Sequence, residues 1–273
     1  MIKSILFKTL YPIFNSIFRY LARKEESEKL ILNKILSDIN FLMGKGFSGP
    51  NSITDEVKSV KRILNSNVPT HIIDVGASSG EYTDTLIKEF PDVKIICFEP
   101  SKVSFEVINS KFKNNENIIC EKIALSDRNG ESYLYSNSPG SRLGSLTKRK
   151  LDHFNIEFEY KEIVKLNKLD TYLEKATYNS KIDFMKLDAE GHELEILKGA
   201  SKSLKKIKLI QFEFGGSNID SKTYFQDFWY FFKENNFKLY RITPFGPAQI
   251  RKYQEEDEYF KTTNYLALNK SLL

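Results

Sequence analysis

Short apolar runs alternate with stretches of helical spacing from about residue 69 onward. The runs at 71–77, 93–99 and 117–125 lack a regular apolar–polar alternation, which indicates strands covered on both faces. Residues 81–90 and 102–112, which separate these runs, have the spacing of helices. This order predicts parallel strands joined by crossover helices.

The same order returns in the second half of the chain. Residues 182–188 and 207–214 read as strands, and residues 192–200 and 224–234 as helices. Two further β-like runs end the chain with no helix between them, which predicts an antiparallel pair. We therefore expect an α/β, Rossmann-like fold: a mainly parallel sheet, helices on both faces and an antiparallel C-terminal strand pair.

The section between these halves has a different pattern. Asn129 and Gly130 stand between two short β-like pieces and predict a hairpin. Residues 139–150 are rich in Gly, Ser and basic side chains, which is typical of a surface loop. Residues 162–166 then predict a strand, and residues 169–174 a brief helix.

The first 65 residues read as helical and carry none of the strand pattern. Apolar positions predict helices at 27–42 and 54–64, joined by a Gly/Pro/Ser connector at 44–52. We expect two parts, an N-terminal helical arm over 1–65 and one larger domain over 66–273.

Residues 1–24 are apolar but contain basic side chains. The longest uncharged stretch, 9–18, is about half the length that a bilayer span requires. No small-residue cleavage site follows it, so a secretory signal fits poorly. Two interpretations stay open: an amphipathic helix that lies on a membrane surface, or a helix that packs on its own domain or on a second subunit. Pro12 is expected to start or kink that helix.

The composition limits the kinds of partner. A hydrophobic fraction of 41% in 273 residues is enough for one large core, and the net charge of +5 is weaker than expected of a nucleic-acid-binding domain. Cys97 and Cys120 have no metal-ligand neighbours in the sequence and read as buried thiols of a reducing compartment. We expect a cytoplasmic protein that binds no nucleic acid. A peripheral contact with the inner membrane surface through 1–24 and a homodimer are the open partner interpretations.

A glycine turn joins the first strand to the first helix, at the edge of the sheet where α/β folds bind nucleotide-like ligands. Gly76 allows a tight turn and Gly80 a close helix approach. A dinucleotide fingerprint needs a third glycine between them for the pyrophosphate, and Ser78 stands there instead. Glu99 ends the second strand, where a carboxylate can accept from ribose hydroxyls. This spacing favours S-adenosylmethionine, which has no phosphate, over NAD.

A second polar segment, residues 186–193, follows a buried strand and opens a helix. Asp188 and His192 are four residues apart and can share a face, with Glu190 between them. A histidine with carboxylates can remove a proton from a hydroxyl. A purely structural interpretation is also open, in which Asp188 caps the helix and the other two side chains face water.

These segments together resemble the FkbM-type methyltransferases over about 70–240. The resemblance rests on five motifs in order: DVGASSGEYT (74–83), CFEP (97–100), IALSD (123–127), MKLDAEGHE (185–193) and LIQFE (209–213). The family implies an S-adenosylmethionine-dependent O-methyltransferase that acts on hydroxyls of sugars, glycans or natural products. The motif around LDAEGHE is the most specific of the five.

The resemblance also implies roles for individual residues. The cofactor would be bound along the carboxyl edge of the sheet by Asp74, Gly76, Ala77, Gly80, Glu99, Ala124, Leu125, Ser126 and Asp188. The catalytic residues would be Asp188, Glu190 and His192, which would face the transferring methyl group, and Glu213 would lie on the same edge. Many relatives carry an Asn-type residue where this chain has Ser78 and Ser79.

The expected reaction is in-line methyl transfer to a hydroxyl, with His192 as the first candidate base, oriented by Asp188 or Glu190. Nothing in the spacing demands a metal, and we predict none. Two other functions remain as alternatives: an NAD(P)-dependent oxidoreductase, and a non-catalytic, membrane-associated binding module on the same fold. Nucleic-acid methylation is disfavoured, because residues 188–191 lack the Pro-Pro-aromatic turn often found in amino-group methyltransferases.

Overall fold

The computed structural model describes residues 2–23, 26–47, 53–65, 67–176, 178 and 180–273. Part of the expected connector, 48–52, lies outside the described residues. The chain divides into two compact units, Met1–Met43 and Gly44–Leu273. The sequence suggested a boundary at residue 65, but helix α3 (Ile53–Leu64) packs against strands of the larger unit and belongs to it.

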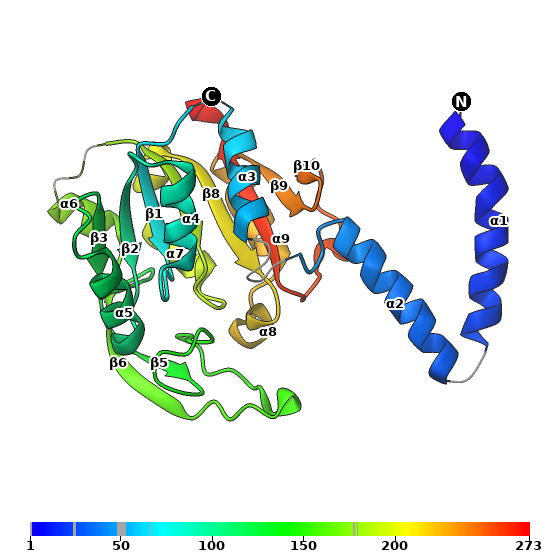
Figure 1. Cartoon of the computed structure of the whole chain (residues 1–273), viewed down its shortest axis with the longest axis horizontal. Helices are drawn as coiled ribbons and strands as arrows, with labels where there is room; N and C mark the ends of the chain where they lie inside the picture. The colour runs from blue at the N-terminus through cyan, green and yellow to red at the C-terminus, as the bar shows by residue number, and fades with distance from the viewer. Residues whose placement is uncertain (1, 24–25, 48–52, 66, 177, 179) are drawn as a thin grey trace. The chain divides into compact units, whose positions relative to one another are not determined.

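A sheet of eight strands forms the centre of the larger unit, with the order β10-β9-β11-β8-β7-β1-β2-β3 (Figure 1). The strands are β1 (His71–Val75), β2 (Lys94–Phe98), β3 (Ile118–Glu121), β7 (Ile182–Leu187), β8 (Ile207–Phe214), β9 (Phe237–Thr243), β10 (Gly246–Ile250) and β11 (Thr263–Asn269). The strands β3, β2, β1, β7 and β8 are parallel, and β11, β9 and β10 continue the sheet in antiparallel pairs. The predicted α/β fold is confirmed; the C-terminal part has three strands where two runs were expected.

Helices cover both faces of this sheet, as the apolar pattern of its strands requires. The helices are α4 (Glu81–Glu89), α5 (Lys102–Phe112), α6 (Leu169–Lys175), α7 (Glu193–Gly199), α8 (Ser217–Ser221) and α9 (Phe225–Glu234). Apolar side chains of α3, α4 and α5 form one core with one face of the sheet, and those of α6, α7 and α9 form a second core with the other. Neighbouring residues on β1 illustrate the division, since Ile72 belongs to the first core and Ile73 to the second.

The hairpin expected at Asn129 and Gly130 is wrong. Strand β5 (Gly130–Ser136) begins there but pairs with β6 (Tyr160–Asn167), in a small sheet of order β4-β6-β5. Asn129 is used differently: its side-chain oxygen accepts from the Lys168 amide at 2.9 Å, which ties the start of β5 to the end of β6. The apolar run at 117–125 also divides, because β4 (Ala124–Leu125) leaves the main sheet to pair with β6.

The N-terminal unit consists of two helices, α1 (Ile2–Ala22) and α2 (Glu26–Leu42), which contact each other. Helix α1 continues through Pro12, so this proline neither starts nor ends it. Among the described residues, no helix is both long and apolar enough to cross a membrane.

The aromatic centre of the second core gives a first prediction. Phe212 is fully buried, with ring centroids of Phe228, Phe232 and Tyr265 at 4.8, 5.1 and 5.3 Å. Phe212→Ala removes these contacts and leaves a cavity, so we expect it to lower the free energy of unfolding by about 3–5 kcal/mol in denaturant titrations. The control Phe245→Ala, at a side chain 73% exposed, should change it by less than about 0.5 kcal/mol. Equal effects of both substitutions would contradict this packing.

Candidate functional site

The turn after β1 lies in backbone contact with the loop after β7. Gly76 has φ of +76°, and a Cβ there would stand 1.8 Å from the carbonyl oxygen of Asp188. Gly80 also has φ of +76°, and a Cβ there would stand 2.7 Å from the Phe112 ring. Both positions require a positive φ and have no room for a Cβ, and only glycine meets both requirements, as the sequence suggested. The contact brings the two polar segments of the sequence to one place.

Asp74 supports this turn from within the protein. Its side chain is fully buried, accepts from the Thr83 hydroxyl at 2.6 Å and lies 3.9 Å from the Lys186 ammonium group. Burial raises the pKa of Asp74, while the Lys186 charge opposes that rise. Asp74 lines neither of the two cavities described below, so its contribution to a ligand would come through the turn and Lys186.

Glu99 closes the second strand with its carboxylate held by two backbone amides. The Ser78 amide donates to it at 2.7 Å and the Ser101 amide at 2.9 Å. Burial raises the pKa of Glu99 to about 7, although the two amides oppose the shift. The carboxylate therefore links the glycine turn to the tip of β2 and borders the inner cavity.

The inner cavity lies beside the glycine turn and the tip of β2. Glu99 and the glycine turn line one part of it. Its remaining walls are mostly apolar: Val75, Phe98, Ile123, Ala124, Leu125, Leu134, Leu146 and Ile196. An apolar slot beside a ribose-binding carboxylate and a phosphate-free glycine turn fits an adenosine joined to methionine, so the residues present fit S-adenosylmethionine.

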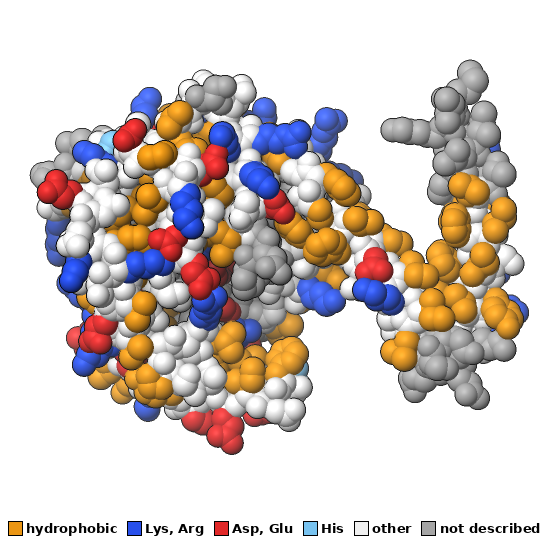
Figure 2. All heavy atoms as spheres, viewed as in Figure 1, with side chains coloured by type: hydrophobic (Ala, Val, Ile, Leu, Met, Phe, Trp, Pro, Cys, Tyr) orange, Lys and Arg blue, Asp and Glu red, His pale blue; other side chains and the backbone are white. Residues whose placement is uncertain are grey.

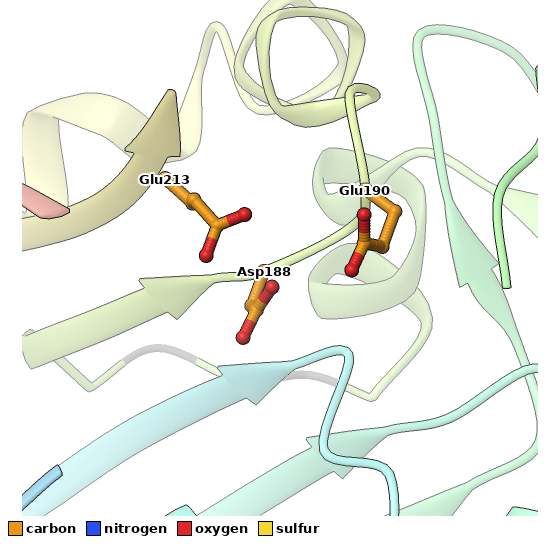
Figure 3. A group of neighbouring side chains, drawn as sticks. All are labelled: Asp188, Glu190 and Glu213. Carbon is orange, nitrogen blue, oxygen red and sulfur yellow. The ribbon is translucent and has the colours of Figure 1, made fainter. Parts of the chain in front are cut away.

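A wider outer cleft adjoins this cavity, and both are lined by Gly76, Asp188 and Glu190. Three carboxylates meet there, from Asp188, Glu190 and Glu213, each with an oxygen within 4.8 Å of the others (Figure 3). Figure 3 shows Glu213 on its strand with its carboxylate directed towards the other two. This spacing would also admit a cation, but an acidic cluster alone does not identify a metal site.

The three carboxylates differ in their partners. Lys186 donates to Asp188 at 3.0 Å, and Arg149 donates to Glu190 at 2.6 Å. Among the described residues, the side chain of Glu213 has neither a hydrogen bond nor an ion pair. Burial, followed by the charges of Asp188 and Glu190, raises the pKa of Glu213 well above its usual value. Burial also raises the pKa of Glu190, to about 7.

His192 lies apart from these acids. Its Nε2 atom is 3.0 Å from the Ser126 hydroxyl, and its side chain borders the inner cavity but not the outer cleft. Burial lowers the pKa of His192, so its neutral form is favoured. The sequence suggested that Asp188 or Glu190 orients His192, and the structure gives that place to Ser126 instead.

The structure thus gathers most of the residues expected at the site. Gly76, Glu99, Ala124, Leu125, Asp188, Glu190 and His192 line the inner cavity, and Ala77 lines the outer cleft. Asp74, Gly80 and Ser126 stand behind these walls. Arg149 was not expected here, because its position in a basic loop gave no sign of its contact with Glu190. Cys97 and Cys120 are free thiols, and only Cys97 is fully buried.

This fold, with its glycine turn, strand-end carboxylate and apolar slot, defines the class of S-adenosylmethionine-dependent methyltransferases. The model of the methyltransferase FkbM domain matches residues 74–239, and the chain belongs to that family. S-adenosylmethionine is accordingly the cofactor of this domain.

Two curated relatives are methyltransferases. Methyltransferase sdnD of Sordaria araneosa is 29% identical over 164 residues, which are 50% of this chain and 63% of that protein. The 2-O-methyltransferase NoeI of Sinorhizobium fredii is 22% identical over 184 residues, 64% of this chain and 75% of that protein. The chain therefore matches less than two thirds of the length of the first.

Solved structures also align with the chain. A putative O-methyltransferase from Klebsiella pneumoniae aligns over 94% of this chain and 96% of its own, with 10% identity and a TM-score of 0.45. The O-methyltransferase from Bacillus cereus, solved in complex with SAH, aligns over 93% and 97%, with 11% identity and a TM-score of 0.44.

The protonation of Glu99 gives a second prediction. Ribose hydroxyls donate to the ionised carboxylate, so binding should release a proton below the pKa of about 7. We expect the affinity for S-adenosylhomocysteine, measured by calorimetry, to rise up to about tenfold per pH unit towards pH 7 and then level off. The stability of the cofactor-free protein should change with pH in the opposite direction. Because the folded carboxyl retains its proton above the usual pKa of 4.5, this group lowers stability as pH rises through that window.

Matched variants distinguish the effects of Glu99 and Glu190, two carboxyls whose pKa values are both raised to about 7. Glu99→Gln should weaken binding by roughly 10- to 100-fold and flatten its pH dependence. Glu190→Gln should leave most of that dependence in place, because Glu190 is paired with Arg149 and lies away from the end of β2, where the ribose is expected. An unchanged pH dependence in Glu99→Gln would show that Glu99 does not hold the ribose.

Proposed function

We propose that this protein is an O-methyltransferase that transfers a methyl group to a hydroxyl of a sugar, glycan or natural-product acceptor bound in the outer cleft. The observation that carries this proposal is the carboxylate group of Asp188, Glu190 and Glu213 at the junction of the two cavities. Carboxylates at that point can accept hydrogen bonds from acceptor hydroxyls. The name of NoeI, a 2-O-methyltransferase, supports oxygen as the receiving atom.

Different residues of the chain have different roles in this mechanism. Bound S-adenosylmethionine supplies an electrophilic methyl group. Glu99 and the glycine turn hold the nucleoside and methionine parts, and Asp188 borders both ligands. Lys186 and Arg149 fix the carboxylates of Asp188 and Glu190, so positioning contributes strongly to the rate.

The proton of the acceptor hydroxyl needs a receiving group, and Glu213 is best placed for it. Its carboxylate faces the outer cleft and has no protein partner among the described residues. Its raised pKa makes its ionised carboxylate a stronger base than an exposed one. His192, the base suggested by the sequence, lies on the inner cavity beside Ser126, where a role in cofactor binding fits better.

The charges of the outer cleft support a neutral acceptor. Arg142 is paired with Glu81, Arg149 with Glu190, and Lys186 with Asp188. Because these three cations already have anionic partners and three carboxylates lie beside them, the cleft offers little to a phosphate backbone, although Lys261 also lines it. This favours a hydroxyl-bearing small molecule or glycan over nucleic acid.

For the whole chain we also propose a cytoplasmic location and an interaction role for the N-terminal arm. The free thiols fit a reducing compartment. The arm exposes apolar side chains that either a membrane surface or a second copy in a homodimer could cover.

Cofactor titration separates this function from the oxidoreductase alternative. We expect S-adenosylhomocysteine to bind in calorimetry with micromolar affinity or better, and NADH to give no saturable heat. The reason is that Ser78 stands where a pyrophosphate requires glycine. Saturable NADH binding with no response to S-adenosylhomocysteine would overturn the assignment.

Isotope transfer tests the reaction and the base together. The parent protein, incubated with methyl-labelled S-adenosylmethionine and a cell extract, should label a non-protein fraction. The label should resist mild alkali, because methyl ethers survive it and methyl esters release methanol. Glu213→Gln should lower that labelling by about 10²- to 10⁴-fold. His192→Ala should stay within a few-fold of the parent when the cofactor is saturating.

The controls keep the two parts of this proposal distinct. Both variants must still bind S-adenosylhomocysteine, which shows that the cofactor site is intact. A His192→Ala protein that binds but does not transfer, beside an active Glu213→Gln protein, would return the base role to His192. Alkali-labile label would contradict a hydroxyl acceptor. Loss of labelling on chelation, restored by Mg²⁺, would assign the three acids to a metal instead.

A further inference from the structure

Helix α1 exposes a stripe of large apolar side chains. Leu10, Ile13, Phe14 and Ile17 are spaced three, four and seven residues apart, and they are 40%, 55%, 49% and 47% exposed. This spacing places them on one side of the helix. Figure 2 shows apolar side chains gathered along α1 and α2. Contiguous exposure of this kind marks an interaction surface.

The opposite side of α1 is basic. Lys8 and Arg19 of α1 and Arg23 directly after it are exposed, and helical geometry places Lys8 and Arg19 across the axis from the apolar stripe. Residues 1–24 contain five basic residues and no acidic one: Lys3, Lys8, Arg19, Arg23 and Lys24. Helix α2, in contrast, carries both signs of charge. The net positive charge of the arm therefore comes from residues 1–24.

We propose that α1 docks on the surface of an anionic lipid bilayer. In this arrangement the helix lies in the plane of the surface, with Leu10, Ile13, Phe14 and Ile17 at the acyl boundary. The side chains of Lys8, Arg19 and Arg23 lie among the anionic headgroups. Apolar residues on one face and Lys/Arg on the other are the features of helices that lie on membranes.

Charge complementarity favours lipid over a second copy of the chain. A two-fold interface through the apolar stripes would leave the basic sides of both α1 helices facing solvent, with no anionic partner. An anionic bilayer neutralises those charges, and each near-surface basic side chain then contributes about 1 kcal/mol. Lipid binding can be measured without knowledge of the acceptor or the reaction, so its failure and that of the proposed function are distinguishable.

Vesicle sedimentation of the full-length protein tests the proposal. The probes are vesicles of phosphatidylcholine alone and vesicles in which a third of the lipid is phosphatidylglycerol. We expect the protein to pellet with the anionic vesicles, to remain largely in solution with the neutral ones, and to be released as salt is raised. Equal partition between the two vesicle types, or no pelleting with either, would overturn the proposal.

Matched variants locate the contact on α1. Lys8→Gln with Arg19→Gln should weaken anionic binding by roughly 30-fold, since two contributions of about 1 kcal/mol are lost. Ile13→Asp with Ile17→Asp should abolish it. The control Leu36→Asp with Ile39→Asp, at exposed positions of α2, should leave it within a few-fold of the parent.

Two further measurements serve as controls. The first establishes that the variants are folded, and the second establishes which partner covers the apolar stripe. Circular dichroism and S-adenosylhomocysteine binding must match the parent, which shows that the fold is intact. Sedimentation velocity without lipid decides the competing occupant: a dimer that Ile13→Asp with Ile17→Asp dissociates would assign the stripe to a second copy and overturn the lipid proposal. An α2 control as damaging as the α1 variant would also overturn it.

Discussion

The backbone contact between the turn after β1 and the loop after β7 is the constraint on which the site depends. At Gly76 the two loops are so close that any side chain would overlap the Asp188 carbonyl. The contact exists because β1 and β7 are parallel neighbours, with Asp74 beside Lys186 in the register. It places Asp188 at the boundary of two cavities, so one wall serves both ligands. A methyl group can pass between two bound molecules only if such a shared wall holds them close.

The concentration of acids around this wall has a physical reason in the cofactor. S-adenosylmethionine carries a sulfonium charge, and in the proposed site the carboxylates of Asp188 and Glu190 would stabilise it. Buried acids are costly in their charged form, because burial raises the pKa values of Glu99 and Glu190 to about 7. Lys186 offsets part of this cost. Burial alone would lower its pKa, but Asp188 and Asp74 raise it above the usual value and keep it charged.

The sequence predicted the features that depend on local pattern. The buried strands and the helices between them were expected because their apolar spacing reports burial directly. Glu99 was recognised from its position after a strand, and the glycine turn from Gly76 and Gly80. The absence of a third glycine favoured S-adenosylmethionine over NAD. The predictions that were wrong concerned contacts between residues far apart in the sequence. Asn129 and Gly130 have the composition of a hairpin turn, but the Asn129 side chain bonds to the Lys168 amide just after β6. His192 shares a short segment with Asp188, yet the start of α7 turns it towards Ser126.

The strands, rather than the loops, fix the positions of the buried polar side chains behind the site. The strand register places Lys186 beside Asp74 on one side and beside Gln211 on the other. Gln211 accepts from the Tyr82 hydroxyl at 2.7 Å and donates to buried Glu56 at 2.7 Å. The Tyr82 ring lies 4.8 Å from the Lys186 ammonium group, so the helix after the glycine turn also contacts this cation.

Glu213 follows Gln211 by two residues on β8, and alternation along a strand gives both the same face of the sheet. The buried hydrogen bonds of Gln211 with Tyr82 and Glu56 hold this part of β8, and with it the backbone position from which Glu213 faces the cleft. The loops that shape the acceptor pocket can vary without disturbing that position, because the strand holds it.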